Sequence, residues 1–234
     1  MLRVAGRKEL AFGARVTWRG QLRRRLTPNR PLTLTTLAGL DNSELLPPTV
    51  RAHRNEDLLL GEMTRRVHAC AWSLDLPWGL PHWRSPAKRW LERSANFRQE
   101  PAHFLMDYLD QAAPRIASDR PRDRMHALAA IVLDLAATAE RHLVELVEQQ
   151  GADTASRVQF AIAAAQDDPE VPAPWKDTLR PWLASPTLST NPAIVRDRLA
   201  SPATVRAMAK HYGNALTLWP QLWDHAREWA SARR

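Results

Sequence analysis

The residues best suited to chemistry in this sequence are arginines gathered near its amino-terminal end. Residues 1–40 contain nine lysines and arginines and a single acid, Glu9, so this stretch carries the net charge of the whole chain, +8. Residues 101–234 contain fifteen basic and sixteen acidic residues. Because guanidinium groups bind phosphate oxygens through paired hydrogen bonds, this asymmetry predicts a polyanionic partner. We expect that partner to be nucleic acid, either RNA or DNA.

A basic hairpin is the element expected to present these arginines. Apolar and polar residues alternate over residues 10–19, and residues 32–35 alternate again, which is the pattern of half-buried strands. The connection over 20–31 contains the turn-forming sequence Thr27-Pro28-Asn29. The alternative is a solvated basic loop without a ligand. If the hairpin follows a phosphate backbone, the arginines expected to bind it are Arg15, Arg19, Arg23, Arg24, Arg25 and Arg30.

A second basic segment lies over residues 82–98, where Lys88, Arg89 and Arg93 alternate with Trp83 and Trp90. Arginines and aromatic rings in one segment can hold single-stranded nucleic acid, with phosphates on the cations and bases on the rings. We therefore add these three cations to the expected nucleic-acid contacts. The sequence favours core packing for the two tryptophans, because aromatic residues at helical spacing usually pack inward.

Catalytic and metal-binding patterns are missing from the sequence. It has no Gly-x-Ser-x-Gly, no phosphate-binding glycine loop and no dinucleotide fingerprint. None of its eight histidines has another at helical spacing, so we expect no metal site and no cofactor. A metal-independent ribonuclease would need only an acid/base beside a cation, and His53, His68 and His82 would be its candidates. We expect a non-enzymatic protein, with such an endoribonuclease as the alternative.

Hydrophobic periodicity predicts a mainly α fold, a helical bundle-like body with a small N-terminal β element, either a hairpin or a short sheet. The β element covers residues 1–42 and packs on the body, which covers 43–234; a boundary near 100–120 is the alternative to a single body. Apolar residues recur at three and four positions in most of the body. The expected helices are 49–74, 86–97, 101–113, 121–150, 154–165, 175–184, 193–199 and 203–212, with a further stretch to the end.

Composition indicates the compartment and the partners. One cysteine, Cys70, fits a reducing environment, and no apolar run approaches the ~20 residues of a membrane span. We therefore expect a cytoplasmic protein without a membrane partner. Ten tryptophans are many for 234 residues, and exposed tryptophans favour protein interfaces. The leading hypothesis is a nucleic-acid-binding, non-catalytic subunit of a nucleoprotein complex, and a further alternative is a helical adaptor with a basic docking face.

Overall fold

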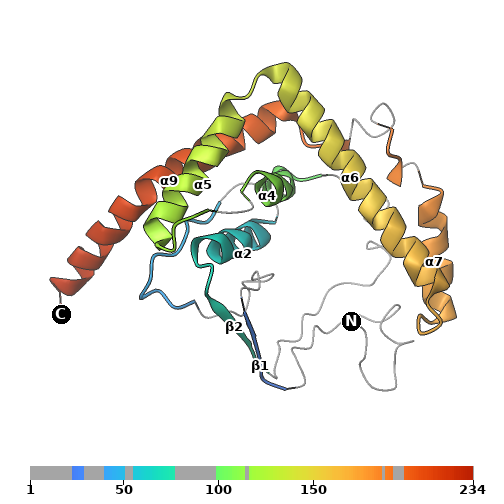
Figure 1. Ribbon diagram of the computed structural model, residues 1–234, viewed down its shortest axis with the longest axis horizontal. Coiled ribbons are helices and arrows are strands. Elements are labelled where there is room, and N and C mark those ends of the chain that lie inside the picture. The colour runs from blue at the N-terminus through green and yellow to red at the C-terminus, as the bar shows by residue number, and fades with distance from the viewer. Residues whose placement is uncertain are drawn as a thin grey trace. The chain divides into compact units, whose positions relative to one another are not determined.

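The computed structural model describes residues 23–28, 40–50, 55–76, 99–113, 116–185, 188–191 and 198–233 (Figure 1). Its described part is mainly helical and has a two-stranded sheet near the amino terminus, which confirms the predicted fold class. The elements are β1 (Arg25–Pro28), α2 (Glu56–Val67), β2 (Trp72–Asp75), α4 (Pro101–Ala112), α5 (Pro121–Ala137), α6 (Glu140–Asp167), α7 (Ala173–Leu183) and α9 (Pro202–Ser231).

The chain divides into two compact units, with the boundary inside α6. The sheet-containing unit comprises Arg23–Leu76, Glu100–Glu145 and Ala200–Arg234. The α6–α7 unit comprises Leu146–Leu199 and, among the other described residues, Gln99. The packing of residues 1–42 on the body stays a prediction.

Proline places the start of several helices. Pro101, Pro121 and Pro202 are the first residues of α4, α5 and α9. Proline is favoured there because the first helical N–H has no partner within the helix and the ring fixes a helical φ. The predicted helix over 101–113 is confirmed almost to the residue. The prediction for 175–184 is confirmed as well, with α7 beginning two residues earlier.

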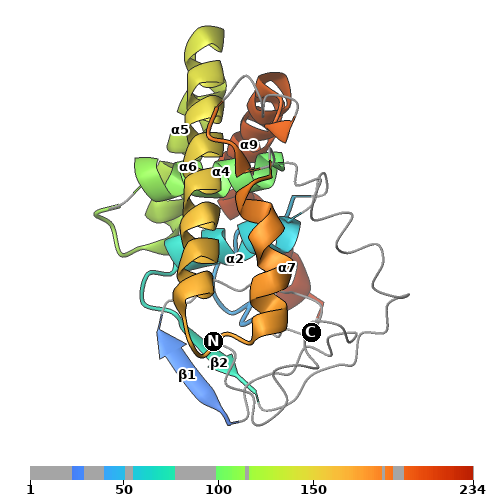
Figure 2. The same cartoon turned by 90° about the vertical axis from the view of Figure 1, so that its right-hand side faces the viewer.

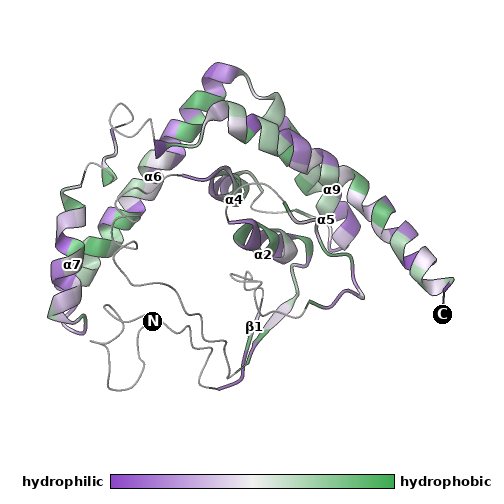
Figure 3. Cartoon of the chain, turned by 180° about the vertical axis from the view of Figure 1, so that it is seen from behind, coloured by the Kyte–Doolittle hydropathy of each residue, from purple (hydrophilic) through white to green (hydrophobic). Residues whose placement is uncertain are grey.

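The core of the sheet-containing unit lies where α5 packs along α9 and where α2 and α4 pack beside them (Figure 1). Along α5 and α9, hydrophobic and hydrophilic residues alternate in patches (Figure 3), as expected of helices with one buried side. The fully buried side chains come from all four helices and include Leu59, Met63, Phe104, Leu109, Met125, Leu128, Leu135 and Leu216.

Within the α6–α7 unit, reciprocal hydrogen bonds join the ends of the two helices. The Gln166 side-chain amide donates to the Lys176 carbonyl oxygen over 2.8 Å, and the Lys176 ammonium donates to the Gln166 carbonyl oxygen over 2.6 Å. Figure 2 shows α7 running alongside the second half of α6. Between the helices the chain turns at Asp168 and Pro169, where a hydrogen bond from the Val171 N–H to the Asp168 carbonyl closes the turn.

The long helix predicted over 121–150 is wrong in its boundaries. The helix is interrupted at Thr138, whose ψ of 137° is extended. As a result, α5 ends at Ala137 and α6 begins at Glu140. From there α6 runs through Gly151 to Asp167 and absorbs the helix predicted over 154–165. Gly151 lies inside the helix, at a point where the end of the Leu199 side chain packs closely against the backbone of α6.

The carboxyl-terminal prediction needs a similar correction, because α9 continues through Gly213 and Pro220 as one helix. A Cβ on Gly213 would lie 2.7 Å from Leu133 Cγ, so the glycine allows α9 to approach α5 closely. Both Gly213 and Pro220 are buried. Tertiary packing thus overrides two residues that disfavour a helix interior.

The β element also differs from the predicted hairpin. The strands expected over 10–19 and 32–35 lie outside the described residues, and β1 forms inside the stretch expected to connect them. It pairs antiparallel with β2, in a register that sets Arg25 opposite Asp75 and Pro28 opposite Trp72. Residues 72–74 fall at the end of the helix predicted over 49–74, and this part of the prediction is wrong because α2 stops at Val67 and Trp72 begins β2. Pro28 is tolerated because it ends its strand, where a missing N–H costs little.

Candidate nucleic-acid interface

The three consecutive arginines expected to bind phosphate stand at the start of the β ribbon. Arg23 and Arg24 directly precede β1, and Arg25 is its first residue. All three are exposed. Within the described ranges, no carboxylate lies at ion-pair distance from their guanidinium groups. Their positive charge is therefore presented to solvent close together.

The two faces of the ribbon differ in chemistry. Side chains alternate along a strand, so Leu26 and Pro28 share one face with Trp72 and Leu74, which oppose them across the sheet. We call these four residues the apolar ribbon face. Leu26, Trp72 and Leu74 are 59%, 61% and 57% exposed. The other face carries Arg25 opposite Asp75 and Thr27 opposite Ser73. Arg25 is exposed, whereas Thr27, Ser73 and Asp75 are only partly exposed.

This exposure is the reverse of the usual pattern, in which the apolar face of a sheet packs on a core and the polar face meets water. Sequence reasoning missed the apolar ribbon face because Leu74 also fitted a helical repeat. A signal was present, since Trp72-Ser73-Leu74-Asp75 alternates apolar and polar residues with the period of a strand.

The other predicted phosphate contacts and catalytic candidates mostly cannot be placed. Arg15, Arg19, Arg30, Lys88, Arg89, Arg93, His53 and His82 lie outside the described residues. His68 follows α2 directly, and its Nε2 donates a hydrogen bond of 2.8 Å to the Leu45 carbonyl oxygen. This bond ties the loop around Leu45 to the end of α2, a structural role for the partly buried imidazole.

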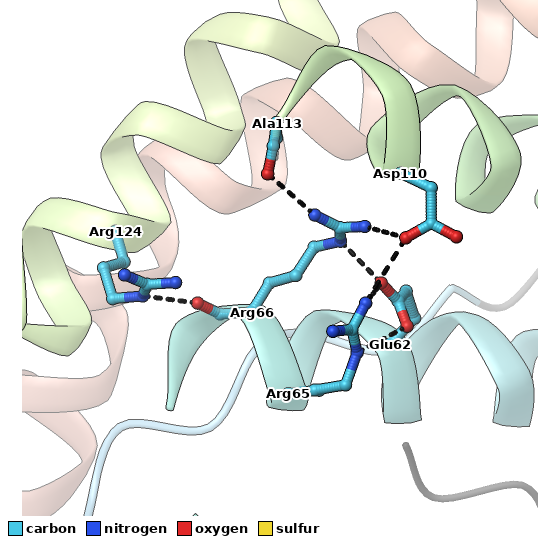
Figure 4. Close-up of polar contacts among 6 residues, drawn as sticks. All are labelled: Glu62, Arg65, Arg66, Asp110, Ala113 and Arg124. Carbon is cyan, nitrogen blue, oxygen red and sulfur yellow. Dashed lines mark hydrogen bonds and ion pairs between the residues drawn. The ribbon is translucent and has the colours of Figure 1, made fainter. Parts of the chain in front are cut away.

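Other arginines of the same unit are committed to holding the fold together. Arg65 and Arg66 both contact the Glu62 carboxylate one turn earlier on α2, and both reach Asp110 on α4 (Figure 4). The hydrogen bond that Arg65 donates to Glu62 is the main reason why the pKa of Arg65 is raised. Arg66 is buried, and it also donates to the Ala113 carbonyl oxygen over 3.0 Å. These two cations are therefore neutralised within the protein.

Arg124 of α5 is committed in the same way (Figure 4). Its guanidinium donates to the carbonyl oxygens of Arg66, Ile116 and Ser118. It thereby joins the end of α2 to the segment that leads into α5. An arginine with three backbone partners has few donors left for a ligand.

A shallow groove of about 430 Å³ opens at the start of α5 and beside α9. Its lining includes three arginines and three acids, so its formal charge is balanced; these are Arg120, Arg122, Arg227, Glu44, Asp123 and Asp224. The side chain of Arg122 donates a hydrogen bond to Asp224, and this bond is the main reason why the pKa of Asp224 is lowered. Arg227 donates to the Ser43 carbonyl oxygen. Partners within the protein thus occupy two of the three cations, which makes the groove a poorer anion site than the start of the ribbon.

Among the described residues, no three His, Cys, Asp or Glu side chains are grouped as a metal site requires. Within those ranges, no helix combines the length and the apolar composition that crossing a bilayer requires.

No protein-family model, curated protein or solved structure matches this chain.

Proposed function

We propose that this protein binds nucleic acid through the start of its β ribbon, and that it is a non-catalytic subunit of a nucleoprotein assembly. The observation that carries the proposal is the set of three adjacent, exposed arginines, Arg23, Arg24 and Arg25, without a carboxylate partner among the described residues. Arginine side chains are long and flexible, so three of them at the start of one strand can reach phosphates of the same nucleic-acid backbone although they leave the strand on alternating sides. Elsewhere in the same unit, arginines are neutralised by Glu62, Asp110 and Asp224.

Exposed apolar residues on α9 support the assignment as a subunit. Leu218 and Leu222 lie one helical turn apart and are 54% and 56% exposed. Residues at this spacing share a helix side, and exposed apolar side chains on one side are typical of protein interfaces. The ribbon would then hold the nucleic acid while α9 meets a neighbouring subunit.

The salt dependence of binding tests the proposal. Each neutralised phosphate contributes about 0.9 to the slope of log affinity against log salt on duplex, and about 0.7 on single strands. Replacing Arg23, Arg24 and Arg25 by alanine should therefore flatten the slope by about 2 to 3. The measurement is fluorescence anisotropy with labelled RNA and DNA over a range of salt concentrations. An unchanged slope would overturn the assignment of the ribbon.

A matched control separates local contact from net charge. A second triple variant, Arg141→Ala with Arg157→Ala and Arg180→Ala, removes an equal number of positive charges from exposed positions on α6 and α7. It should leave the slope close to that of the unmodified protein. Equal flattening by both variants would indicate a diffuse attraction instead of a site at the ribbon. Full-length protein that shows no salt-dependent binding to either nucleic acid would favour the adaptor alternative.

A further inference from the structure

The apolar ribbon face suggests which form of nucleic acid the protein binds. Leu26, Trp72 and Leu74 each leave more than half of the side chain exposed, on a ribbon of only two strands. Such a ribbon is marginally stable alone, so exposing its apolar face to water is unfavourable unless a ligand covers it. Arg24, two residues before Leu26, continues this side of the strand, so the ligand of the face should be both anionic and able to present flat apolar surfaces.

We infer that this ligand is single-stranded nucleic acid, with bases stacked on Trp72 and backbone phosphates on Arg24, which alternation places on the same side as Leu26, while Arg23 and Arg25 hold neighbouring phosphates at the edge of the ribbon; this inference rests on the proposed function. A tryptophan ring accepts any base because every base has a π face. In a duplex those faces are covered by neighbouring base pairs. Only an unpaired strand can offer bases to Trp72 and phosphates to the arginines together.

The chemistry of the face disfavours duplex recognition. A two-stranded ribbon fits the major groove, but it reads base edges there through hydrogen-bonding side chains. The apolar ribbon face carries two leucines, a proline and a tryptophan, so its side chains offer the indole N–H of Trp72 as their hydrogen-bonding group. It therefore suits the faces of bases and not their edges.

The spacing along the ribbon agrees with one short segment of nucleic-acid strand. Pro28, the cross-strand partner of Trp72, is four residues after Arg24, so the two positions fall on the same side of an extended chain. Four residues of extended chain span about 13 Å, so the phosphate at Arg24 and the base at Trp72 belong to nearby nucleotides.

The test compares a labelled 15-nucleotide single strand with the matching 15-base-pair duplex, in anisotropy titrations at one low salt concentration. Trp72→Ala should weaken single-strand binding about 10- to 100-fold, as the loss of base stacking predicts, and should leave duplex binding unchanged. Trp72→Phe should retain most of the affinity because it keeps an aromatic ring. Trp229→Ala removes a tryptophan of similar exposure, 60%, from α9 and should have no effect.

The outcomes separate this inference from the proposed function. If the triple arginine variant weakens binding while Trp72→Ala leaves single-strand binding unchanged, the ribbon binds nucleic acid without stacking and the inference is overturned. If the triple arginine variant has no effect, the proposed function fails first. Circular dichroism and thermal melting of Trp72→Ala confirm that the variant is folded, and Leu74→Ala, on the same face, provides a second test with a smaller expected loss.

Discussion

Glu62 and Arg66 form an ion pair one turn apart on α2, with 2.6 Å between the Arg66 Nε and the Glu62 carboxylate. Their side chains are 9% and 7% exposed. The N–H at Arg66 Nε is not aligned for a hydrogen bond to Glu62. The other two guanidinium nitrogens of Arg66 donate to Asp110 and to the Ala113 carbonyl oxygen. A charge this deeply buried is tolerated only because several partners surround it.

We expect Arg66→Met to lower the free energy of unfolding by about 3 kcal/mol. Removing one member of a buried ion pair typically costs ~3–5 kcal/mol, and the low end applies because Arg65 still contacts Glu62. Arg65→Met should cost about 1 kcal/mol or less, because Arg65 is 27% exposed and more screened by water. Urea denaturation of the two variants, which lose the same charge, provides the comparison.

A double variant distinguishes lost pairing from lost packing. Replacing Glu62 by leucine together with Arg66→Met removes both buried charges, and such apolar replacements are often nearly neutral. Most of the stability lost in Arg66→Met should return. If the double variant is less stable than Arg66→Met, Glu62 stabilises the protein through its remaining contact with Arg65, and an unpaired buried charge is not the cause of the loss.

Two helical glycines should respond differently to alanine. At Gly213 a Cβ would lie 2.7 Å from Leu133 Cγ and 3.3 Å from the Leu133 backbone N. Overpacking of this kind costs about 1–3 kcal/mol, which exceeds the gain of ~1 kcal/mol in helix propensity. We expect Gly213→Ala to lower the thermal midpoint, and Leu133→Ala in the same chain to make the added methyl tolerable.

Gly151 is the matched comparison, because a Cβ there would overlap only the side chain of Leu199. A methyl group at the end of a flexible side chain can move aside, whereas a backbone atom cannot. Gly151→Ala should therefore be neutral or should stabilise the protein by up to about 1 kcal/mol. A larger loss for Gly151→Ala than for Gly213→Ala would contradict the packing described for both helices.

How far the sequence predicts this fold is clearest at these glycines. The proline starts at Pro101 and Pro202 depend on local chemistry, so they could be read directly. Gly151 and Gly213 directly follow the helices predicted over 121–150 and 203–212, where glycine is common. Both lie inside helices, at points where another part of the chain packs closely against them, and the identity of that neighbour cannot be read from the local pattern.

The candidate site was predictable in charge but not in geometry. Arg23, Arg24 and Arg25 stood out because acids are nearly absent around them. Trp72 did not, because its strand partner Pro28 is 44 positions earlier in the chain and had been assigned to a turn. A strand of four residues contains too few alternations to exclude the end of a helix.

Stability should fall at alkaline pH because of Tyr212. Burial raises the pKa of the Tyr212 hydroxyl far above its ordinary value, and the hydroxyl donates to the Pro48 carbonyl oxygen over 3.2 Å. Above about pH 10 the unfolded chain releases this proton while the folded chain keeps it. The free energy of unfolding should then fall with rising pH by up to about 1.4 kcal/mol per unit.

The two tyrosines of the chain provide the measurement and its control. Tyr212→Phe should reduce the alkaline slope, at a cost of about 1 kcal/mol near neutral pH from the lost hydrogen bond. Burial, aided by the charge of Asp134, also raises the pKa of Tyr108, but Tyr108 is only partly buried. Tyr108→Phe should therefore change the slope less. Equal slopes for the unmodified protein and Tyr212→Phe between pH 9 and 12, in urea denaturation, would refute this assignment.

Lysine at Arg23, Arg24 and Arg25 should separate the number of phosphate contacts from their quality. Three lysines neutralise as many phosphates as three arginines, so the slope of log affinity against log salt should stay unchanged. Affinity at each salt concentration should fall several-fold, because an ammonium group lacks the planar pair of donors that fits a phosphate. Anisotropy titrations of the lysine and alanine variants in parallel measure both quantities. If the lysine variant flattened the slope as much as the alanine variant does, positive charge alone would not suffice at these positions, and contact with the phosphates would depend on the paired donors of the guanidinium group.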